Sequence, residues 1–232
     1  MPGPCASAAG GTGSLCLSDN MPVSGIWSWA NEFSEPDPAE HVRGRRRDDE
    51  ATGDIQGGEG VIRKAEERDI AAVERHYDEL LTYEEKHGSR TKWKRGVYPT
   101  RSVAEKGVEK GELFVMEEDG EIRASMILNH VQLQEYAAIP WLHEAEPDKV
   151  LVIHTLCVPP SQAGRGTGSR MVRFALEEAE RRGCEVMRID TWEHNEPAAA
   201  LYRRLGFRHA GKTAVLFEGV IAEHLIFLEK RI

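Results

Sequence analysis

The chain has 232 residues, of which 30 are basic and 39 acidic, so its formal net charge is −9. This length permits one large domain or two small ones, and a hydrophobic content of 40% is enough to build a core. No run of about 18 apolar residues occurs, which excludes a membrane-spanning helix and a membrane partner, and the four scattered cysteines without a CxxC pair indicate a reducing compartment, the cytoplasm.

Residues 1–60 are predicted to form a low-complexity, disordered acidic tail. They hold 4 arginines and 10 acidic residues, and no apolar period of 2 or 3.6 persists in them. Such a segment buries too little apolar surface to offset the entropy of ordering it, roughly 1–2 kcal/mol per residue. Trp27 and Trp29 leave open a docked or partner-binding tail. Residues 61–232 carry 26 basic and 29 acidic residues, a nearly even balance that argues against a nucleic-acid partner.

The regular pattern begins at residue 61. Residues 61–65 are expected to form a short strand, and residues 67–87 have apolar side chains near helical spacing. A loop follows at 88–99. Thr100 is placed to cap a short helix that stops at Gly111.

A hairpin is predicted next. Two strands, at 112–117 and 122–128, flank Asp119 and Gly120, a dipeptide typical of a two-residue turn. The remaining expected elements are a long connection at 132–148, a strand at 150–158, a helix from the loop at 164–168 to about 182, a strand at 185–191, a helix at 196–205 and strands near 207–213 and 221–230. This mixture predicts an α/β or α+β layered domain with a mixed sheet.

A glycine-rich loop lies between the expected strand at 150–158 and the following helix. Its residues are Gly164, Arg165, Gly166, Thr167, Gly168 and Ser169. The first N–H groups of a helix have no intrahelical partner, and glycines let a phosphate approach the backbone. No lysine follows as a P-loop requires, and position 171 is Met where a GxGxxG motif requires glycine. The loop therefore binds a phosphate ligand of another class or simply makes a tight turn.

Motifs on both sides of the loop occur in a fixed order. The strand ends in Val158-Pro159, and Asn195-Glu-Pro-Ala-Ala-Ala-Leu-Tyr202 precedes a Leu-Gly-Phe that ends at Phe207. Over residues 150–210 this order resembles the GNAT N-acetyltransferase superfamily, with weaker agreement from 61 to 232. The resemblance implies one domain at 61–232. Its fold is a central mixed, mostly antiparallel, twisted sheet of about six to seven strands flanked by about four helices.

The same resemblance implies a coenzyme A site. The family's loop binds the pyrophosphate, and the strand end offers its backbone to the pantetheine arm between two splayed parallel strands. The cofactor-binding residues so implied are Leu156, Cys157, Val158, Gly164, Arg165, Gly166, Thr167, Gly168, Ser169 and Asn195. Asn195 can also cap the helix that it precedes. The family's Gln or Arg at the start of the loop is Ala163 here, so one side-chain donor is missing.

Tyr202 matches the family's general acid, which protonates the leaving thiolate. A phenol with a pKa of about 10 gives its proton to a thiolate of about 8.5 at a cost of roughly 2 kcal/mol. The alternative is that Tyr202 is an aromatic side chain packed on the sheet.

The catalytic base is predicted to be His154. By the period of two, His154 shares a strand face with Val152 and Leu156 and lies opposite Cys157. The alternatives are a carboxylate, Asp190 or Glu193, acting directly or through water, and a purely structural histidine in the sheet. An acetylated Cys157 is a further alternative.

The function implied is acetyl-CoA-dependent transfer of an acetyl group to a primary amine of a small molecule or peptide, by direct attack on the thioester. Aromatic and acidic residues of two loops are candidates for holding the acceptor: Trp93, Tyr98, Trp141, Glu144, Glu146 and Asp148. We expect no metal, and a monomer or a homodimer. A non-catalytic acyl-CoA-binding regulatory module is the alternative.

Overall fold

The computed structural model describes residues 60–232, so nearly all of the predicted tail lies outside the described residues. The chain forms a seven-stranded sheet in the order β1-β2-β3-β4-β5-β7-β6. The strands are β1 (Val61–Lys64), β2 (Leu113–Glu118), β3 (Glu121–Asn129), β4 (Val150–Cys157), β5 (Val186–Trp192), β6 (Arg208–Phe217) and β7 (Ile221–Arg231). The pair β4–β5 is parallel and the other neighbouring pairs are antiparallel.

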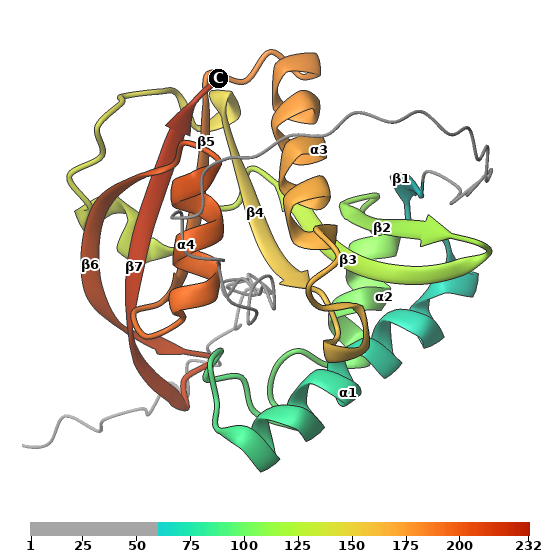
Figure 1. The fold of residues 1–232 in the computed structure, drawn as a ribbon. Coiled ribbons are helices and arrows are strands. Elements are labelled where there is room, and N and C mark those ends of the chain that lie inside the picture. Colours follow the sequence, from blue (N-terminus) through green and yellow to red (C-terminus); the bar gives the residue numbers. More distant parts are fainter. Residues whose placement is uncertain (1–59) are drawn as a thin grey trace, which may run out of the picture.

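Four α-helices flank the sheet (Figure 1). They are α1 (Ile70–His87), α2 (Arg101–Glu109), α3 (Thr167–Arg181) and α4 (Glu196–Arg204). Short 3-10 turns are η1 (Glu67–Asp69), η2 (Gln134–Ala138), η3 (Pro147–Lys149) and η4 (Pro160–Gln162). The predicted fold class, with its numbers of strands and helices, is therefore confirmed.

Local sequence accounts for most element boundaries. Asp119 and Gly120 both have positive φ, 54° and 74°, as a two-residue hairpin turn requires. Gly183, with φ 68°, directly follows the last turn of α3. Thr100 precedes α2 as predicted, but its side chain makes no capping hydrogen bond.

Two apolar clusters cover the two faces of the sheet. On one face, here called the α1 face, side chains of α1 and α2 pack with Val150 and Val152. On the other, the α3 face, side chains of α3 and α4 pack with Leu151 and Ile153. The alternation along β4 thus sends successive side chains to opposite clusters.

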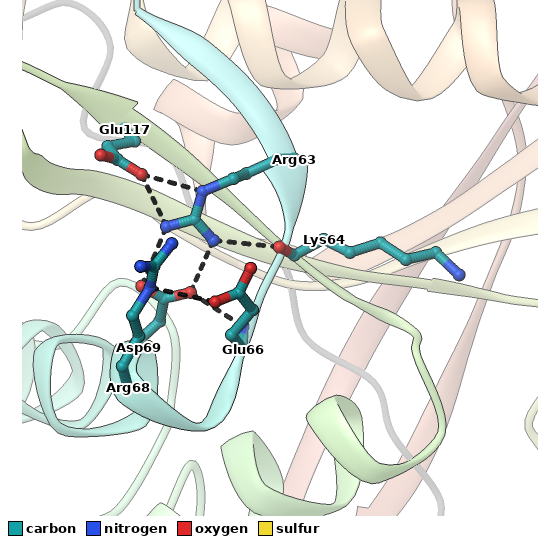
Figure 2. Close-up of polar contacts among 6 residues, drawn as sticks. All are labelled: Arg63, Lys64, Glu66, Arg68, Asp69 and Glu117. Atoms are coloured by element: carbon teal, nitrogen blue, oxygen red, sulfur yellow. Dashed lines mark hydrogen bonds and ion pairs between the residues drawn. The ribbon is translucent and has the colours of Figure 1, made fainter.

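The short edge strand β1 is held by a partly buried ion cluster. Figure 2 shows Arg63 reaching from β1 between Glu117 of β2 and Asp69 at the start of α1. Arg63 donates to both oxygens of Asp69, at 2.7 and 3.0 Å, and to Glu117 at 2.6 and 2.8 Å. The Glu66 amide also donates to Asp69, at 2.8 Å. Burial by itself raises the pKa of Asp69, but these hydrogen bonds outweigh it and hold the pKa below its usual value.

Replacing Asp69 by asparagine is expected to lower the free energy of unfolding by about 1–3 kcal/mol at pH 7, because Arg63 loses its bidentate partner. The depressed pKa makes this contribution fully present above the unfolded pKa, and it is lost as pH falls through the lower folded pKa. Urea unfolding of both proteins at pH 7 and at acid pH measures the difference. The control is Glu105→Gln, which breaks the exposed pair with Arg101 and is expected to change little. Equal losses in the two variants would contradict the role given to Asp69.

Candidate functional site

Strand β4 contains a bulge at Thr155. This residue has a φ of 47°, and the pairing of β4 with β3 shifts register between Ser125 and Ile127. An extra residue in one strand reverses the alternation of the side chains beyond it. The irregularity falls next to the residues on which the predicted chemistry depends.

The predicted strand faces are therefore wrong beyond Thr155. His154 lies opposite Ile127, and Cys157 lies opposite Ser125, so both are on the α1 face. Leu156 packs in the cluster of the α3 face instead of sharing a face with His154. The period of two fails here because it assumes an unbroken strand.

Strands β4 and β5 separate after Val152, before the bulge at Thr155. Their parallel pairing is confined to three residue pairs, the last of which joins Val152 and Arg188, yet the strands continue to Cys157 and Trp192. In Figure 1, β4 runs away from β7 toward the loop that precedes α3. On the side of β5, the backbone of β4 from 153 to 157 has no paired strand, although β3 still pairs with it on the other side, so its polar groups toward β5 need other partners.

The glycine loop lies directly beyond the end of β4. Gly164 and Gly166 have φ of 75° and 74°, a region that other residues enter only with strain. A side chain at either position would meet no atom within 4 Å, so the backbone conformation and not space requires glycine there. The first helical bond of α3 joins the Arg170 amide to the Gly166 carbonyl at 3.0 Å.

This geometry leaves a helix N-terminus open to a ligand. The amides of Thr167, Gly168 and Ser169 precede the first helical bond and have no acceptor within the helix. The residues from Gly164 to Gly166 are exposed, while Thr167 and Gly168 are buried. Donors and dipole together favour an anion such as a pyrophosphate at this point.

Tyr202 is buried beside the opening. Its side chain, fully inaccessible to solvent, packs in the cluster of the α3 face with Leu156 and Val158. Within residues 60–232 its hydroxyl has no hydrogen-bond partner. Burial, and secondarily the Asp190 carboxylate, raises the pKa of Tyr202 well above its usual value, so the phenol stays protonated at neutral pH. A buried orphan hydroxyl costs stability, which is typical of a group that serves a ligand.

Asn195 caps α4 as predicted. Its side-chain oxygen accepts from the Ala198 amide at 3.3 Å, and its amide donates to Thr191 at 3.0 Å. The residue is fully buried. Capping accounts for its position, and its contact with a coenzyme stays a prediction.

His154 lies inside the sheet. Its Nε2 is 3.0 Å from the side-chain oxygen of Asn129, whose amide in turn donates to Glu112 at 2.9 Å. It is fully inaccessible to solvent. These contacts match the alternative of a purely structural histidine in the sheet, and the catalytic role of His154 stays a prediction.

The two alternative carboxylates differ in their surroundings. Glu193 forms a close ion pair with Lys212, and this hydrogen bond lowers the pKa of the Glu193 carboxyl. Asp190 is buried on the α1 face, opposite Phe227, and accepts a hydrogen bond from Tyr136 at 2.8 Å. Of the two, only Asp190 lies where β4 and β5 have separated.

The acceptor loops are placed differently from the prediction. Trp93 and Tyr98 are buried in the core of the α1 face, where Tyr98 forms a close hydrogen bond with the Thr155 hydroxyl. The acids of the 132–148 connection, Glu144, Glu146 and Asp148, are exposed and precede the first residue of β4. Because the glycine loop follows the other end of that strand, these acids lie far from the opening.

Arg188 and Glu229 hold the same connection against the sheet. Arg188 stacks on Trp141, with its guanidinium 4.0 Å from the ring centre, and donates to the His143 carbonyl at 3.0 Å. Glu229 accepts the His143 amide at 2.9 Å. The connection is thereby fixed so that Tyr136 reaches Asp190.

Sequence analysis missed a third carboxylate near the opening. Glu223 on β7 is partly buried, and one of its oxygens has no partner among the described residues. Burial, and then repulsion by Asp190, raises its pKa to about 8. No motif marks Glu223, because a single acid in an alternating strand normally faces solvent.

Two further features concern residues 60–232 as a whole. None of their helices is long and apolar enough to cross a membrane. No group of three or more His, Cys, Asp or Glu side chains there could hold a metal ion. The predicted absence of a metal stays a prediction.

The sequence model of the acetyltransferase (GNAT) family matches residues 71–207, more than half of the chain. The chain belongs to the GNAT family. The fold agrees, since a GNAT-family acetyltransferase from Streptococcus agalactiae superposes with a TM-score of 0.63 at 23% identity, covering 75% of this chain and 95% of that one. The yncA protein of Salmonella typhimurium, solved with its cofactor acetyl-CoA, has a TM-score of 0.54 at 19% identity and covers 75% and 94%.

Similarity in sequence is confined to a shorter stretch. The chain is 40% identical over 76 residues to the N-alpha-acetyltransferase RimI of Mycobacterium tuberculosis, which is 33% of this chain and 46% of RimI. It is 31% identical over 80 residues to the streptothricin acetyltransferase of Streptomyces lavendulae, which is 34% of this chain and 42% of that protein. The chain thus matches less than half the length of these curated relatives.

Cys157 is expected to resist alkylation in the folded protein. Its side chain is fully buried, and burial raises the pKa of its thiol well above the usual value, so little thiolate forms. Iodoacetamide labelling at pH 8 with peptide mass spectrometry measures this, and labelling in urea is the control. Rapid labelling of Cys157 in the folded protein would instead favour the alternative in which Cys157 carries the acetyl group.

Proposed function

We propose that this chain is an acetyl-CoA-dependent N-acetyltransferase. It moves an acetyl group to a primary amine of a small molecule or peptide by direct attack of the amine on the thioester. One observation carries the proposal: β4 loses its pairing with β5 before the glycine loop, and Tyr202, whose hydroxyl has no partner among residues 60–232, packs in one cluster with Leu156 and Val158 at the end of β4. The names of RimI and the streptothricin enzyme support an acetyltransferase.

The coenzyme is proposed to lie along the opening. The amides at the start of α3 receive its pyrophosphate, with Arg165 adding a positive charge. The freed backbone at Leu156, Cys157 and Val158 pairs with its pantetheine arm and polarises the thioester carbonyl. Asn195 is proposed to contact the coenzyme from the start of α4, the helix that it caps.

The residues supply acid chemistry and favour a direct transfer. The amine nitrogen forms a bond to the carbonyl carbon and loses one proton to solvent, while the bond from that carbon to sulfur breaks. The sulfur takes the proton of Tyr202, and the phenolate regains a proton from solvent. Cys157 is buried and protonated, which argues against an acetyl-cysteine intermediate. The nearly even charge of 61–232 and the scattered cysteines without a CxxC pair support a protein of the cytoplasm that uses no nucleic acid. It is proposed to act as a monomer or homodimer.

Gly166→Ala is expected to weaken binding of coenzyme A at least tenfold, because a left-handed alanine is strained and its relief moves the amides of α3. Gly183→Ala is the matched control. It lies at the other end of α3, has a similar φ of 68°, and likewise meets no atom within 4 Å. Both variants are expected to lose about 1 kcal/mol of stability. Calorimetric titration measures binding, and equal affinities would contradict the loop's assignment.

The proposed activity is tested by release of free thiol from acetyl-CoA against a panel of small amines, amino acids, an aminoglycoside and a short peptide. Turnover with at least one amine is expected. Tyr202→Phe is expected to lower kcat about 100-fold while the Kd for acetyl-CoA changes little, since the acid acts in the transition state.

Tyr83→Phe serves as the control for removing a phenol. Tyr83 stacks on His87 on α1, at 4.0 Å between ring centres, and is expected to leave kcat unchanged. Coenzyme binding without thiol release for any amine would favour the regulatory module. A fully active Tyr202→Phe variant would remove the acid from the mechanism.

A further inference from the structure

A cleft that collects positive charge lies at the end of β4 away from the glycine loop. It is bounded by β1, by the C-terminal ends of α2 and α3, and by His130, whose ring is bonded to the carbonyl of Val150, the first residue of β4. Its volume is about 580 Å³, which is large enough for a small organic ligand. Four basic residues and one acidic residue line it, namely Lys64, Lys110, Arg181, Arg182 and Glu112.

The two lysines of this cleft carry charges that no described residue neutralises. Neither ammonium group makes a hydrogen bond or ion pair within residues 60–232. Figure 2 shows the Lys64 side chain pointing away from the ion cluster around Arg63. It extends toward the end of α2, where its Nζ lies 3.3 Å from the position that a side-chain carbon would take at Gly111. Strand β1 and helix α2 therefore bring two unpaired ammonium groups to one cleft.

The two arginines of the cleft share one carboxylate. Arg181 donates to Glu178 at 2.6 and 2.7 Å, and Arg182 donates to the same group at 2.8 Å. The guanidinium of Arg182 also lies 5.8 Å from the ring centre of Phe114. With Glu178 included, four positive charges at the cleft face two negative ones, which leaves an excess of two positive charges.

Helix dipoles account for only part of this charge. The C-terminal end of a helix attracts basic side chains, which explains Lys110 at the end of α2 and Arg181 at the end of α3. The same effect does not explain Lys64, which lies on a strand. A ligand that bridges the three elements would use all of these charges.

A second cavity, beside Arg63, has a similar size but no comparable set of unpaired charges. Its volume is about 530 Å³, and four arginines line it. Three of them are each paired with a carboxylate: Arg63 with Asp69, Arg68 with Glu66 and Arg123 with Glu121. The cleft at Lys64 differs because its lysines are left for a ligand.

The cleft also offers hydrogen-bonding groups to an uncharged part of a ligand. One carboxylate oxygen of Glu112 accepts the side-chain amide of Asn129 at 2.9 Å. The other oxygen makes no hydrogen bond within residues 60–232, so it can accept one from a hydroxyl group. The wall beside Glu112 thus suits a hydroxylated compound better than an apolar one.

We propose that this cleft binds a phosphate monoester of a small hydroxylated compound, of which a sugar phosphate is an example. A phosphate monoester carries about 1.5–2 negative charges at pH 7, which matches the excess of two positive charges. Its three free oxygens accept hydrogen bonds from several directions, so they can bind Lys64 of β1 and Lys110 of α2 together. The hydroxyl groups of the ligand are left for Glu112.

This site is separate from the one proposed for the coenzyme. The glycine loop precedes the first turn of α3, whereas Arg181 is the last residue of that helix. Because α3 has 15 residues, its two ends lie roughly 22 Å apart. The inference therefore goes beyond acetyl transfer and does not rest on it.

The test is calorimetric titration of ribose 5-phosphate into protein saturated with coenzyme A, which occupies the glycine loop. One binding site with a Kd below about 1 mM is expected. Lys64→Gln and Lys110→Gln are each expected to weaken binding about tenfold, because each loses one charge-assisted hydrogen bond. Both side chains are exposed, so the variants are expected to unfold in urea like the wild type.

Lys86→Gln is the matched control. Lys86 is an exposed cation in the last turn of α1 and does not line the cleft, so the variant removes one charge without touching the site. Its affinity for ribose 5-phosphate is expected to change less than about twofold. Equal affinities in all three lysine variants, or no binding up to about 10 mM, would overturn the site.

Two further probes separate the two parts of the ligand. Inorganic phosphate is expected to bind about fivefold more weakly than ribose 5-phosphate, and ribose is expected not to bind measurably. Equal binding of inorganic phosphate would mean that the cleft takes the ion alone, which would overturn the ester. If coenzyme A does not bind, the proposed function fails, while the titration without it still tests the cleft through the lysine variants.

Discussion

The bulge at Thr155 is the constraint on which the candidate site depends. A threonine with φ near 47° is strained by about 1–3 kcal/mol, and it follows directly on the point where the pairing of β4 with β5 has ended at Val152. Packing around Tyr98 offsets this cost, because that ring is fully buried, contacts Phe217 edge-on at 4.8 Å, and bonds to the Thr155 hydroxyl. The core of the α1 face therefore holds the bulge that adjoins the gap between β4 and β5.

The gap between β4 and β5 has chemically different groups on its two sides. From the α3 face come the N-terminus of α3 and the protonated phenol of Tyr202. From the α1 face come the carboxylates of Asp190 and Glu223. Because the sheet separates them, an acid and a base can coexist without bonding to each other. Such a separation suits a reaction that needs a proton removed on one side and donated on the other.

Long-range charged contacts fix the parts that surround the gap. The connection at 132–148 is held by Arg188 and Glu229, and it carries Tyr136 to Asp190. At the other edge of the sheet, Arg63 ties β1 to α1 through Asp69. Several of these groups are buried or half-buried, where screening by solvent is weak, so they position the backbone more firmly than exposed pairs would.

The sequence by itself determined the features that local physics encodes. Helical spacing, the Asp119-Gly120 turn, the glycine loop and the order of motifs from Val158 to Tyr202 each depend on neighbouring residues, and the fold and family predicted from them are confirmed. Even the cap of α4 by Asn195 follows from local chemistry.

Only the tertiary structure decided which side chains meet. The bulge at Thr155 reversed the predicted faces of Leu156 and Cys157, because a register shift depends on the partner strand and not on alternation in the sequence. The His154 ring lies 3.0 Å from the side-chain oxygen of Asn129, and Glu223, which no motif marks, lies near enough to Asp190 for the two carboxylates to repel each other. Burial and charge at these positions come from strands far apart in the chain, so no local pattern could have predicted them.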